Sequence, residues 1–242
     1  MCGRASLSKQ EKELEERFNA TFYQEDIARY NPLPHFNIAP THWHPVITNH
    51  DPQHFVWHRW GLVPFWARDD KIGSKMINAR METLTEKPAF RKAFEQRRCL
   101  VPFDGFYEWK RGPGKSKQPY LIGIDDRRLF SIAGLWETWK TPDGQILPTF
   151  TLITMPPNPL MAGLHDRMPA ILLPEHEQLW LSSDLPTGDV HQLLIPFPAE
   201  HMHAFPVSGR VNRVTEQDPA LIQPIGPEFR PEGSIDLFST LD

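Results

Sequence analysis

The sequence predicts an α+β fold whose core is a mixed, strongly curved, barrel-like β-sheet with short flanking helices. Segments rich in β-branched and aromatic residues dominate the middle of the chain, and helical patterns are interspersed without the regular strand–helix alternation of a parallel sheet. Proline supplies 25 of the 242 residues, about twice its ordinary share, which favours many short elements over long helices. Hydrophobic residues make up 40% of the chain and charged residues 23%, which is enough apolar surface for a packed core.

The first helix is expected to begin at Ser8, because Ser8-Lys9-Gln10-Glu11 has the pattern of a capping box. Leu14 and Phe18 would then lie on one face of this helix. It is expected to end before residues 31–34, where the sequence Asn-Pro-Leu-Pro disfavours helical backbone.

A second helix is predicted over residues 87–97, with Pro88 in its first turn. Short helices are predicted to begin near Pro156, Pro174 and Thr187. The dipeptide Asp51-Pro52 marks a turn between the first two strands. Strands are predicted over residues 44–49, 54–60, 99–103, 106–110, 120–124, 129–139, 149–155 and 202–207. The glycine-containing basic segment 111–117 is expected to form a hairpin loop between two of them.

We expect residues 1–227 to form one domain and residues 228–242, which are polar, acidic and interrupted by proline, to form a loose tail. Charge is unevenly distributed around the net value of −4: residues 214–242 carry −5 and residues 87–117 carry +6. A basic segment on a nearly neutral body is compatible with phosphate binding, although charge alone favours an ordinary solvated face.

The sequence lacks the features of a secreted or membrane protein. No stretch approaches the roughly 20 apolar residues of a membrane span, and the first residues are charged rather than apolar. Only Cys2 and Cys99 are present, which excludes a disulfide framework and a cysteine-rich zinc site. We expect a cytosolic protein that does not bind membranes, with Cys99 as a buried packing residue.

The N-terminal Met1-Cys2 is the first candidate for chemistry. Removal of Met1 would leave a free amine and a thiol on adjacent carbons of Cys2, and these groups ordinarily titrate at about pH 8 and 8.5. A 1,2-aminothiol condenses with an aldehyde to an imine, and the sulfur then closes a five-membered thiazolidine ring. A terminal cysteine can also act as an acyl-transfer nucleophile, or it can be an accidental residue at a frayed end.

Several short motifs accompany this terminus in a fixed order. Together they resemble the SOS-response-associated peptidase (SRAP) family, the abasic-site processing proteins, and the resemblance extends from Cys2 to about Pro224. The motifs are Cys2-Gly3-Arg4, His35-Phe36-Asn37-Ile38-Ala39-Pro40, Trp60-Gly61-Leu62-Val63-Pro64-Phe65-Trp66, Ile77-Asn78-Ala79-Arg80-Met81-Glu82-Thr83, Asp104-Gly105-Phe106-Tyr107-Glu108-Trp109-Lys110 and His165-Asp166-Arg167-Met168-Pro169.

The resemblance implies an enzyme that forms a covalent thiazolidine crosslink between Cys2 and the ring-opened deoxyribose of an abasic site in single-stranded DNA. It implies that Cys2, Asn78, Glu108 and His165 are the active-site residues. It also implies that Arg4, Arg80 and Arg167 contact the DNA. No cofactor and no obligate protein partner are implied, and a monomer in the bacterial cytosol or nucleoid is expected.

The residue types suit these implied roles, although each has an ordinary structural alternative. His165 is suited to open the sugar ring by donating a proton, since imidazole exchanges protons near neutral pH; alternatively it bonds a loop carbonyl. Glu108 would orient the terminal ammonium and accept its proton, or it would be a solvent-facing strand residue. Asn78 would hold a sugar hydroxyl or the aldehyde oxygen, or it would cap a turn.

Basic and aromatic residues would supply the DNA-binding surface. Arg4, Arg80 and Arg167 would pair with phosphates, or each would form a structural ion pair. Trp66, and with less support Phe65 and Trp60, would stack on unpaired bases.

Two alternative functions remain open at this stage. The first is an N-terminal-nucleophile amidohydrolase or peptidase that uses Cys2. The second is a non-catalytic single-strand binding module, which would need no free terminus. The pairs His42/His44 and His201/His203 lack a cysteine or HExxH partner, so no metal site is expected.

Overall fold

The computed structural model describes residues 2–30, 33–114, 116–125 and 128–230. The strands are β1 (Ala5–Leu7), β2 (Thr21–Phe22), β3 (His35–Ile38), β4 (Trp43–Thr48), β5 (Asp51–Trp60), β6 (Asn78–Arg80), β7 (Arg98–Phe103), β8 (Gly105–Arg111), β9 (Lys117–Ile124), β10 (Phe130–Lys140), β11 (Ile146–Met155), β12 (Met168–Pro169) and β13 (Met202–Pro206). The α-helices are α1 (Glu11–Phe18), α2 (Gln24–Arg29), α3 (Pro88–Gln96), α4 (Pro159–Ala162), α5 (Pro174–Leu181) and α6 (Thr187–Gln192). Short 3-10 turns include η1 (Asp70–Lys75), η2 (Met81–Thr83) and η4 (Ala199–His201).

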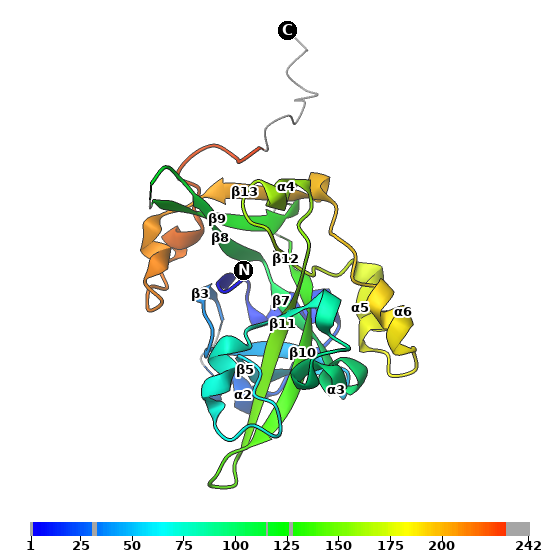
Figure 1. Ribbon diagram of the computed structural model, residues 1–242. Coiled ribbons are helices and arrows are strands. Elements are labelled where there is room, and N and C mark those ends of the chain that lie inside the picture. The colour runs from blue at the N-terminus through cyan, green and yellow to red at the C-terminus, as the bar shows by residue number, and fades with distance from the viewer. Residues whose placement is uncertain (1, 31–32, 115, 126–127, 231–242) are drawn as a thin grey trace.

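A closed barrel forms the lower part of the molecule (Figure 1). Its strands follow the order β11-β10-β7-β4-β5, and a parallel pairing of β11 with β5, in which Phe150 lies opposite Trp60, closes the ring. Trp60, Phe103 and Phe150 are each buried and pack against one another inside it. This closed mixed sheet confirms the predicted α+β class with a barrel-like core.

A second sheet lies against the barrel, in the order β13-β9-β8-β1-β3 (Figure 1). The turn between β7 and β8 connects the two sheets, since β7 belongs to the barrel and β8 to the second sheet. Asp104 in this turn accepts hydrogen bonds from the hydroxyls of Ser6 and Ser8 and from the amide of Ser8, so it holds the β1 segment in place. Strand β1 pairs with β8 in antiparallel register, with Ala5 opposite Phe106. The beginning of the chain is thereby built into the second sheet, between β8 and β3.

The central strands and the basic helix agree with their sequence patterns. The eight predicted strands correspond to β4, β5, β7, β8, β9, β10, β11 and β13, and α3 begins with Pro88 as expected. The predicted turn at Asp51-Pro52 is wrong: the turn lies at residues 49–50, and Asp51 and Pro52 begin β5. The sequence patterns did not identify the short strands β1, β2, β3, β6 and β12. Segments of two to four residues are too short to show a periodic pattern, and their pairing partners are distant in sequence.

The predicted start of the N-terminal helix is wrong, and the helix ends well before the limit set by residues 31–34. The capping residue is Gln10 rather than Ser8, and Glu13 rather than Glu11 accepts the hydrogen bond from the Gln10 amide, at 2.9 Å. Ser8 has a stronger acceptor available in the carboxylate of Asp104. The helix ends at Phe18, since Asn19 adopts a left-handed backbone with φ of 50°, and β2 and α2 follow.

The chain beyond β13 returns to the second sheet instead of leaving it. The amide of Phe229 donates to the carbonyl of Ala204 at 2.7 Å, and its ring packs edge-on against Tyr120. Residue 229 of the predicted loose tail is therefore packed, whereas residues 231–242 lie outside the described residues. Among the described residues, no helix has the length and apolar character that crossing a bilayer requires.

Candidate active site

Residues 2–4 continue β1 along the edge of β8. The amide of Tyr107 donates to the carbonyl of Arg4 at 2.9 Å, which extends the strand pairing toward the start of the chain. The side-chain amide of Asn78 donates to the carbonyl of Cys2, also at 2.9 Å. Cys2 is held from two sides and is only 1% exposed, so it is not the frayed terminal residue that its position in the sequence allowed.

Asn78 reaches Cys2 because β6 pairs in parallel with the end of β11, where Asn78 lies opposite Leu152. Along this short strand Ala79 is buried and Arg80 is exposed. The Nδ2 atom of Asn78 is engaged by Cys2, while its Oδ1 atom is buried without a hydrogen-bond partner among the described residues. An acceptor is thus available beside Cys2.

Glu108 approaches Cys2 from β8. Because side chains alternate along a strand, Tyr107 and Trp109 pack in a small apolar cluster with Val207, and Glu108 points to the opposite face. Its side chain is 4% exposed, which rules out the solvent-facing alternative. Burial raises the pKa of Glu108 above the ordinary value of a glutamate, and His165 lowers it in part when its ring is protonated.

His165 lies in the loop between α4 and β12, with its Nε2 atom 4.0 Å from Oε2 of Glu108. The backbone N–H of Arg167 lies 3.0 Å from Nδ1 of the same ring. A backbone N–H can only donate, so Nδ1 is the acceptor and the neutral ring carries its proton on Nε2, toward Glu108. The carboxylate of Asp166, 87% exposed, lies 2.9 Å from Nδ1 and becomes its partner when the ring is protonated there.

The Cys2 thiol is a neutral group in this environment. Burial raises the pKa of the thiol far above its ordinary value, the negative charge of Glu108 raises it further, and a hydrogen bond from the Arg4 amide lowers it in part. The sequence alone suggested a reactive thiolate fraction at neutral pH, and the structure corrects this. The sulfur can react only if its proton is transferred to a nearby base as it attacks.

The three arginines of the predicted site lie in different environments. Arg80 is exposed on the strand that carries Asn78. Arg4 is half-buried: its Nη1 donates to Oδ1 of Asn37 at 2.8 Å and to the carbonyl of Val211, and its guanidinium lies 5.7 Å from the ring centre of Trp109.

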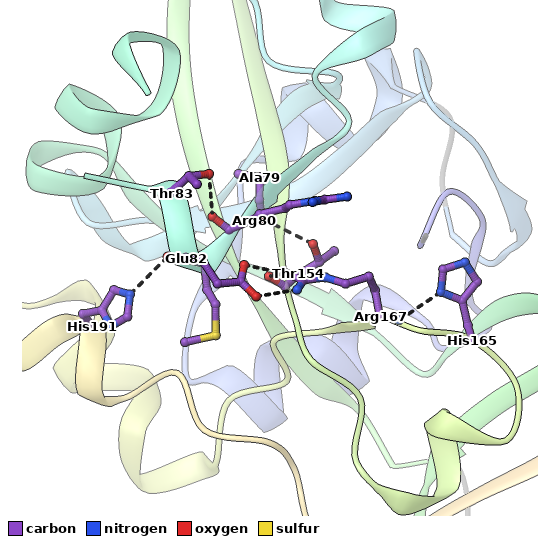
Figure 2. A network of polar contacts seen from close by, with 9 residues as sticks. Ala79, Arg80, Glu82, Thr83, Thr154, His165, Arg167 and His191 are labelled. Carbon is purple, nitrogen blue, oxygen red and sulfur yellow. Dashed lines mark hydrogen bonds and ion pairs between the residues drawn. The ribbon is translucent and has the colours of Figure 1, made fainter. Parts of the chain in front are cut away.

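Arg167 forms a two-pronged ion pair with Glu82 and donates to the carbonyl of Thr154 at 2.6 Å (Figure 2). The structure therefore brings Arg80 and Arg167 together at the end of β11. Glu82 belongs to the network but was not singled out from the sequence, although it lies two residues after Arg80 in one of the motifs noted above.

Trp66 lies beside Ala67 in the segment that follows β5. The carbonyl of Ala67 accepts a hydrogen bond from the indole of Trp139 on β10, which anchors this segment to the barrel. Trp66 and Phe65 are 50% and 54% exposed, so both rings are accessible from outside the protein.

The basic segment 87–117 does not form one surface. Helix α3 lies beside the barrel, whereas β8 and β9 with their connecting loop lie at the opposite end of the molecule (Figure 1). Lys92 of α3 is placed over the ring of Phe65, 5.5 Å from its centre, and Lys110 of β8 over that of Phe229, at 4.0 Å.

A cavity of about 470 Å³ adjoins His165. It is lined by Trp109, Lys110, Arg111 and Ala162–Asp166. The cavity lies between the end of β8 and the loop that carries His165, and His165 is the one member of the predicted active site among its lining residues. It is large enough for a sugar and its flanking phosphate groups.

The histidine pairs have ordinary structural roles where they are described. Nε2 of the buried His44 is bonded to the carbonyl of Pro102, and Nδ1 of His42 accepts weakly from the amide of Ala39. His201 contacts Asp125 through Nδ1 at 3.4 Å. Within the described parts of the chain, no group of three or more His, Cys, Asp or Glu side chains is arranged to hold a metal ion.

Comparison with known proteins places these residues in a family. A family model described as SOS response associated peptidase (SRAP) matches residues 1–214. The abasic site processing protein YoqW of Bacillus subtilis (strain 168) is 44% identical over 225 residues, which cover 92% of this chain and 99% of that protein. The abasic site processing protein HMCES of Xenopus tropicalis is 37% identical over 185 residues, covering 66% of this chain and 54% of that protein.

The fold is shared with a crystallised protein from Bacteroides thetaiotaomicron. That structure superposes with a TM-score of 0.86 at 30% sequence identity, covering 92% of this chain and 99% of the other. A second one, from Bordetella bronchiseptica, has a TM-score of 0.73 at 26% identity and covers 86% of this chain and 100% of the other.

Proposed function

Because the chain belongs to the SOS response associated peptidase (SRAP) family, we propose that it processes abasic sites in DNA by attaching itself covalently to them. Relatives named as abasic site processing proteins support this assignment. The observation that carries it is the convergence of Cys2, Asn78, Glu108 and His165, which come from four separate segments of the chain.

The proposed substrate is an abasic deoxyribose within single-stranded DNA. Exposed Arg80 would pair with a flanking phosphate, aided by Arg4 and Arg167, and the exposed Trp66 would stack on an unpaired base. We propose that the protein acts as a monomer, because one copy of the chain supplies all four converging residues. We also propose that it acts in the cytosol.

The chemistry requires a free amine on Cys2, so Met1 must first be removed. The adjacent Glu108 is a candidate to assist that removal, which accounts for the peptidase in the family name. The result is a 1,2-aminothiol held by Asn78 at its carbonyl, which sets the orientation of the nucleophile before substrate arrives.

The closed sugar must open before it can react. In this step Nε2–H of His165 donates its proton to the ring oxygen, the C1′–O4′ bond breaks, and the C1′ hydroxyl passes its proton to a water molecule to give an aldehyde. The vacant Oδ1 of Asn78 is positioned to accept a hydrogen bond from the hydroxyl released at C4′. Neither oxidation nor reduction is involved.

The amine of Cys2 then attacks C1′, and water leaves to form an imine. Glu108 first takes a proton from the terminal ammonium, which frees the amine for attack, and later returns one to the departing hydroxyl, a role suited to a buried carboxyl with a raised pKa. The Cys2 sulfur adds to C1′ of the imine while its proton passes to the nitrogen, and the thiazolidine ring closes. Overall, an aldehyde and an aminothiol yield a thiazolidine and water.

A crosslinking assay tests the proposal. Protein shown by intact mass to lack Met1 is mixed with a single-stranded oligonucleotide carrying one abasic site, and a heat-stable shifted band on a denaturing gel is expected. The Cys2→Ser protein keeps the amine, so we expect a band only after borohydride reduction of the imine. An unreduced heat-stable band with Cys2→Ala, or no band with the unmodified protein, would contradict the covalent mechanism.

The same preparation separates the alternatives. An N-terminal extension blocks the amine, so it should abolish crosslinking but leave simple single-strand binding intact. If the extended and unextended proteins bind alike and neither crosslinks, a binding module is the better description. Ammonia release from glutamine that is lost on alkylation of Cys2 would instead favour an amidohydrolase.

A further inference from the structure

Glu82 contacts Arg167, a residue of the proposed site, through a two-pronged ion pair. It lies in the 3-10 turn η2, immediately after β6, and both of its carboxylate oxygens engage the guanidinium of Arg167 (Figure 2). The Oε2–Nη2 distance is 2.9 Å. Paired, planar hydrogen bonds of this kind restrict an arginine side chain more tightly than a single contact does.

Arg167 transmits this restraint to His165. Its Nη2 atom also donates to the carbonyl of Thr154 on β11, so the side chain is tied to β11 as well as to η2. Its backbone N–H donates to Nδ1 of His165 at 3.0 Å. A displacement of the Arg167 backbone would therefore remove the contact that keeps the His165 proton on Nε2.

The turn that carries Glu82 has its own support. Nε2 of His191 in α6 contacts the carbonyl of Met81 at 3.1 Å, and this contact does not involve the Glu82 side chain (Figure 2). Exchanging the carboxylate for an amide should leave the turn in place. The effect of such a change then reports on the ion pair rather than on unfolding of η2.

We propose that Glu82 is a positioning residue that acts through Arg167 to hold His165 in its proton-donating orientation. The proposal rests on the proposed function, because the step it serves is the opening of the abasic sugar. Glu82 also offsets the charge of Arg167 next to the exposed Arg80, so it lowers the attraction of this surface for phosphate. Its removal should have two opposite consequences: slower chemistry and equal or tighter DNA binding.

The experiment compares Glu82→Gln with a matched control, Asp70→Asn. Asp70 pairs with Arg59 at 2.9 Å, and its side chain is 45% exposed, as is that of Glu82. Single-turnover crosslinking rates are measured at saturating abasic oligonucleotide. Affinity is measured separately with an oligonucleotide that carries tetrahydrofuran, a sugar analogue that cannot open. The protonation pattern of His165 is read from its ring 15N chemical shifts.

For Glu82→Gln we expect a crosslinking rate at least about tenfold lower, because misplacing a catalytic group by about 1 Å can cost up to a hundredfold. Affinity for the tetrahydrofuran oligonucleotide should be unchanged or higher, and the 15N signals of His165 should shift toward a mixture of tautomers. Asp70→Asn should alter neither the rate nor the 15N signals. Glu82→Asp, one methylene shorter, should recover part of the rate.

An unchanged rate, or a fall in rate explained by weaker binding, would overturn the proposal. Unaltered 15N signals in Glu82→Gln would overturn it as well. Failure of the proposed function is distinguishable, since the unmodified protein would then form no crosslink. The 15N measurement would still decide whether Glu82 positions His165.

Discussion

The Nε2 atom of His165 faces the carboxylate of Glu108 across 4.0 Å, with the start of the chain beside them. Glu108 lies on β8, and His165 lies in the loop before β12. Strands β8 and β12 belong to different sheets. A neutral imidazole with its proton on Nε2 and a buried carboxyl are complementary groups for moving protons to and from one carbon atom. This pairing underlies the first two predictions.

Glu108→Gln should abolish the rise of crosslinking rate with pH. The pKa of Glu108 is raised by burial, so the carboxylate that accepts a proton becomes available only as the pH increases through that raised value. The crosslinking rate of the unmodified protein should fall as the pH is lowered. The glutamine variant should crosslink slowly, and its rate should not show this fall. Single-turnover rates between pH 5 and 8 provide the check. If the rate of the glutamine variant falls in the same way at low pH, a group other than Glu108 causes the fall.

Glu108→Gln should also make the protein more stable at neutral pH. A carboxyl with a raised pKa in the folded state binds its proton more tightly there than in the unfolded chain, so its contribution to stability decreases as pH rises from the unfolded pKa to the folded one. The difference in Tm between variant and unmodified protein should be small in acid and a few degrees at neutral pH. A difference that narrows as pH rises would contradict the direction of the shift.

Asn78→Asp should lower the crosslinking rate by about tenfold. The aspartate has nearly the same shape but no N–H group, so it cannot donate to the carbonyl of Cys2, and one such hydrogen bond is worth about 1 to 1.5 kcal/mol. The new aspartate would also place a second negative charge beside Cys2, in addition to that of Glu108. Binding of tetrahydrofuran DNA provides the control for general damage. A variant that reacts at the original rate would exclude an orienting role for this side chain.

Gly163→Ala should destabilise the fold, and Phe229→Ala should relieve part of that effect. A Cβ placed on Gly163 would lie 2.7 Å from Cζ of the Phe229 ring, which is closer than two carbon atoms can pack. Overpacking of this kind costs about 1–3 kcal/mol. Urea unfolding of the two single variants and the double variant gives the coupling energy. Additive effects would show that the ring moves aside without cost.

Arg98→Met should lower the free energy of unfolding by about 3 kcal/mol, because it leaves several buried carbonyls without a donor. Arg98 is 1% exposed and donates to carbonyls at the ends of two helices: those of Phe94 and Glu95 in α3, and those of Trp180 in α5 and of Ser182, the residue that follows α5. The residue is remote from Cys2, so crosslinking by the folded fraction should be retained. Denaturant unfolding together with the gel assay checks both parts. A stable variant would mean that water replaces the guanidinium at these carbonyls.

Local patterns in the sequence were sufficient for the long elements of the fold. Strands such as β10 and β11 have enough consecutive apolar and β-branched residues to predict their positions, and Pro88 marks the start of α3. The first helix was misplaced because Ser8 and Gln10 are both acceptable caps by local criteria. The difference was decided by Asp104, a carboxylate 96 residues away in the sequence.

The sequence by itself determined which residues have the chemistry for the proposed reaction: a cysteine next to the initiator methionine, and an asparagine, a glutamate and a histidine in separate motifs. Only the tertiary structure decided that these residues meet, that the thiol is neutral, and that Arg167 is paired with Glu82. The physical reason is that burial and partner choice depend on strand pairings between distant segments, such as Asn78 with Leu152, which no local pattern encodes.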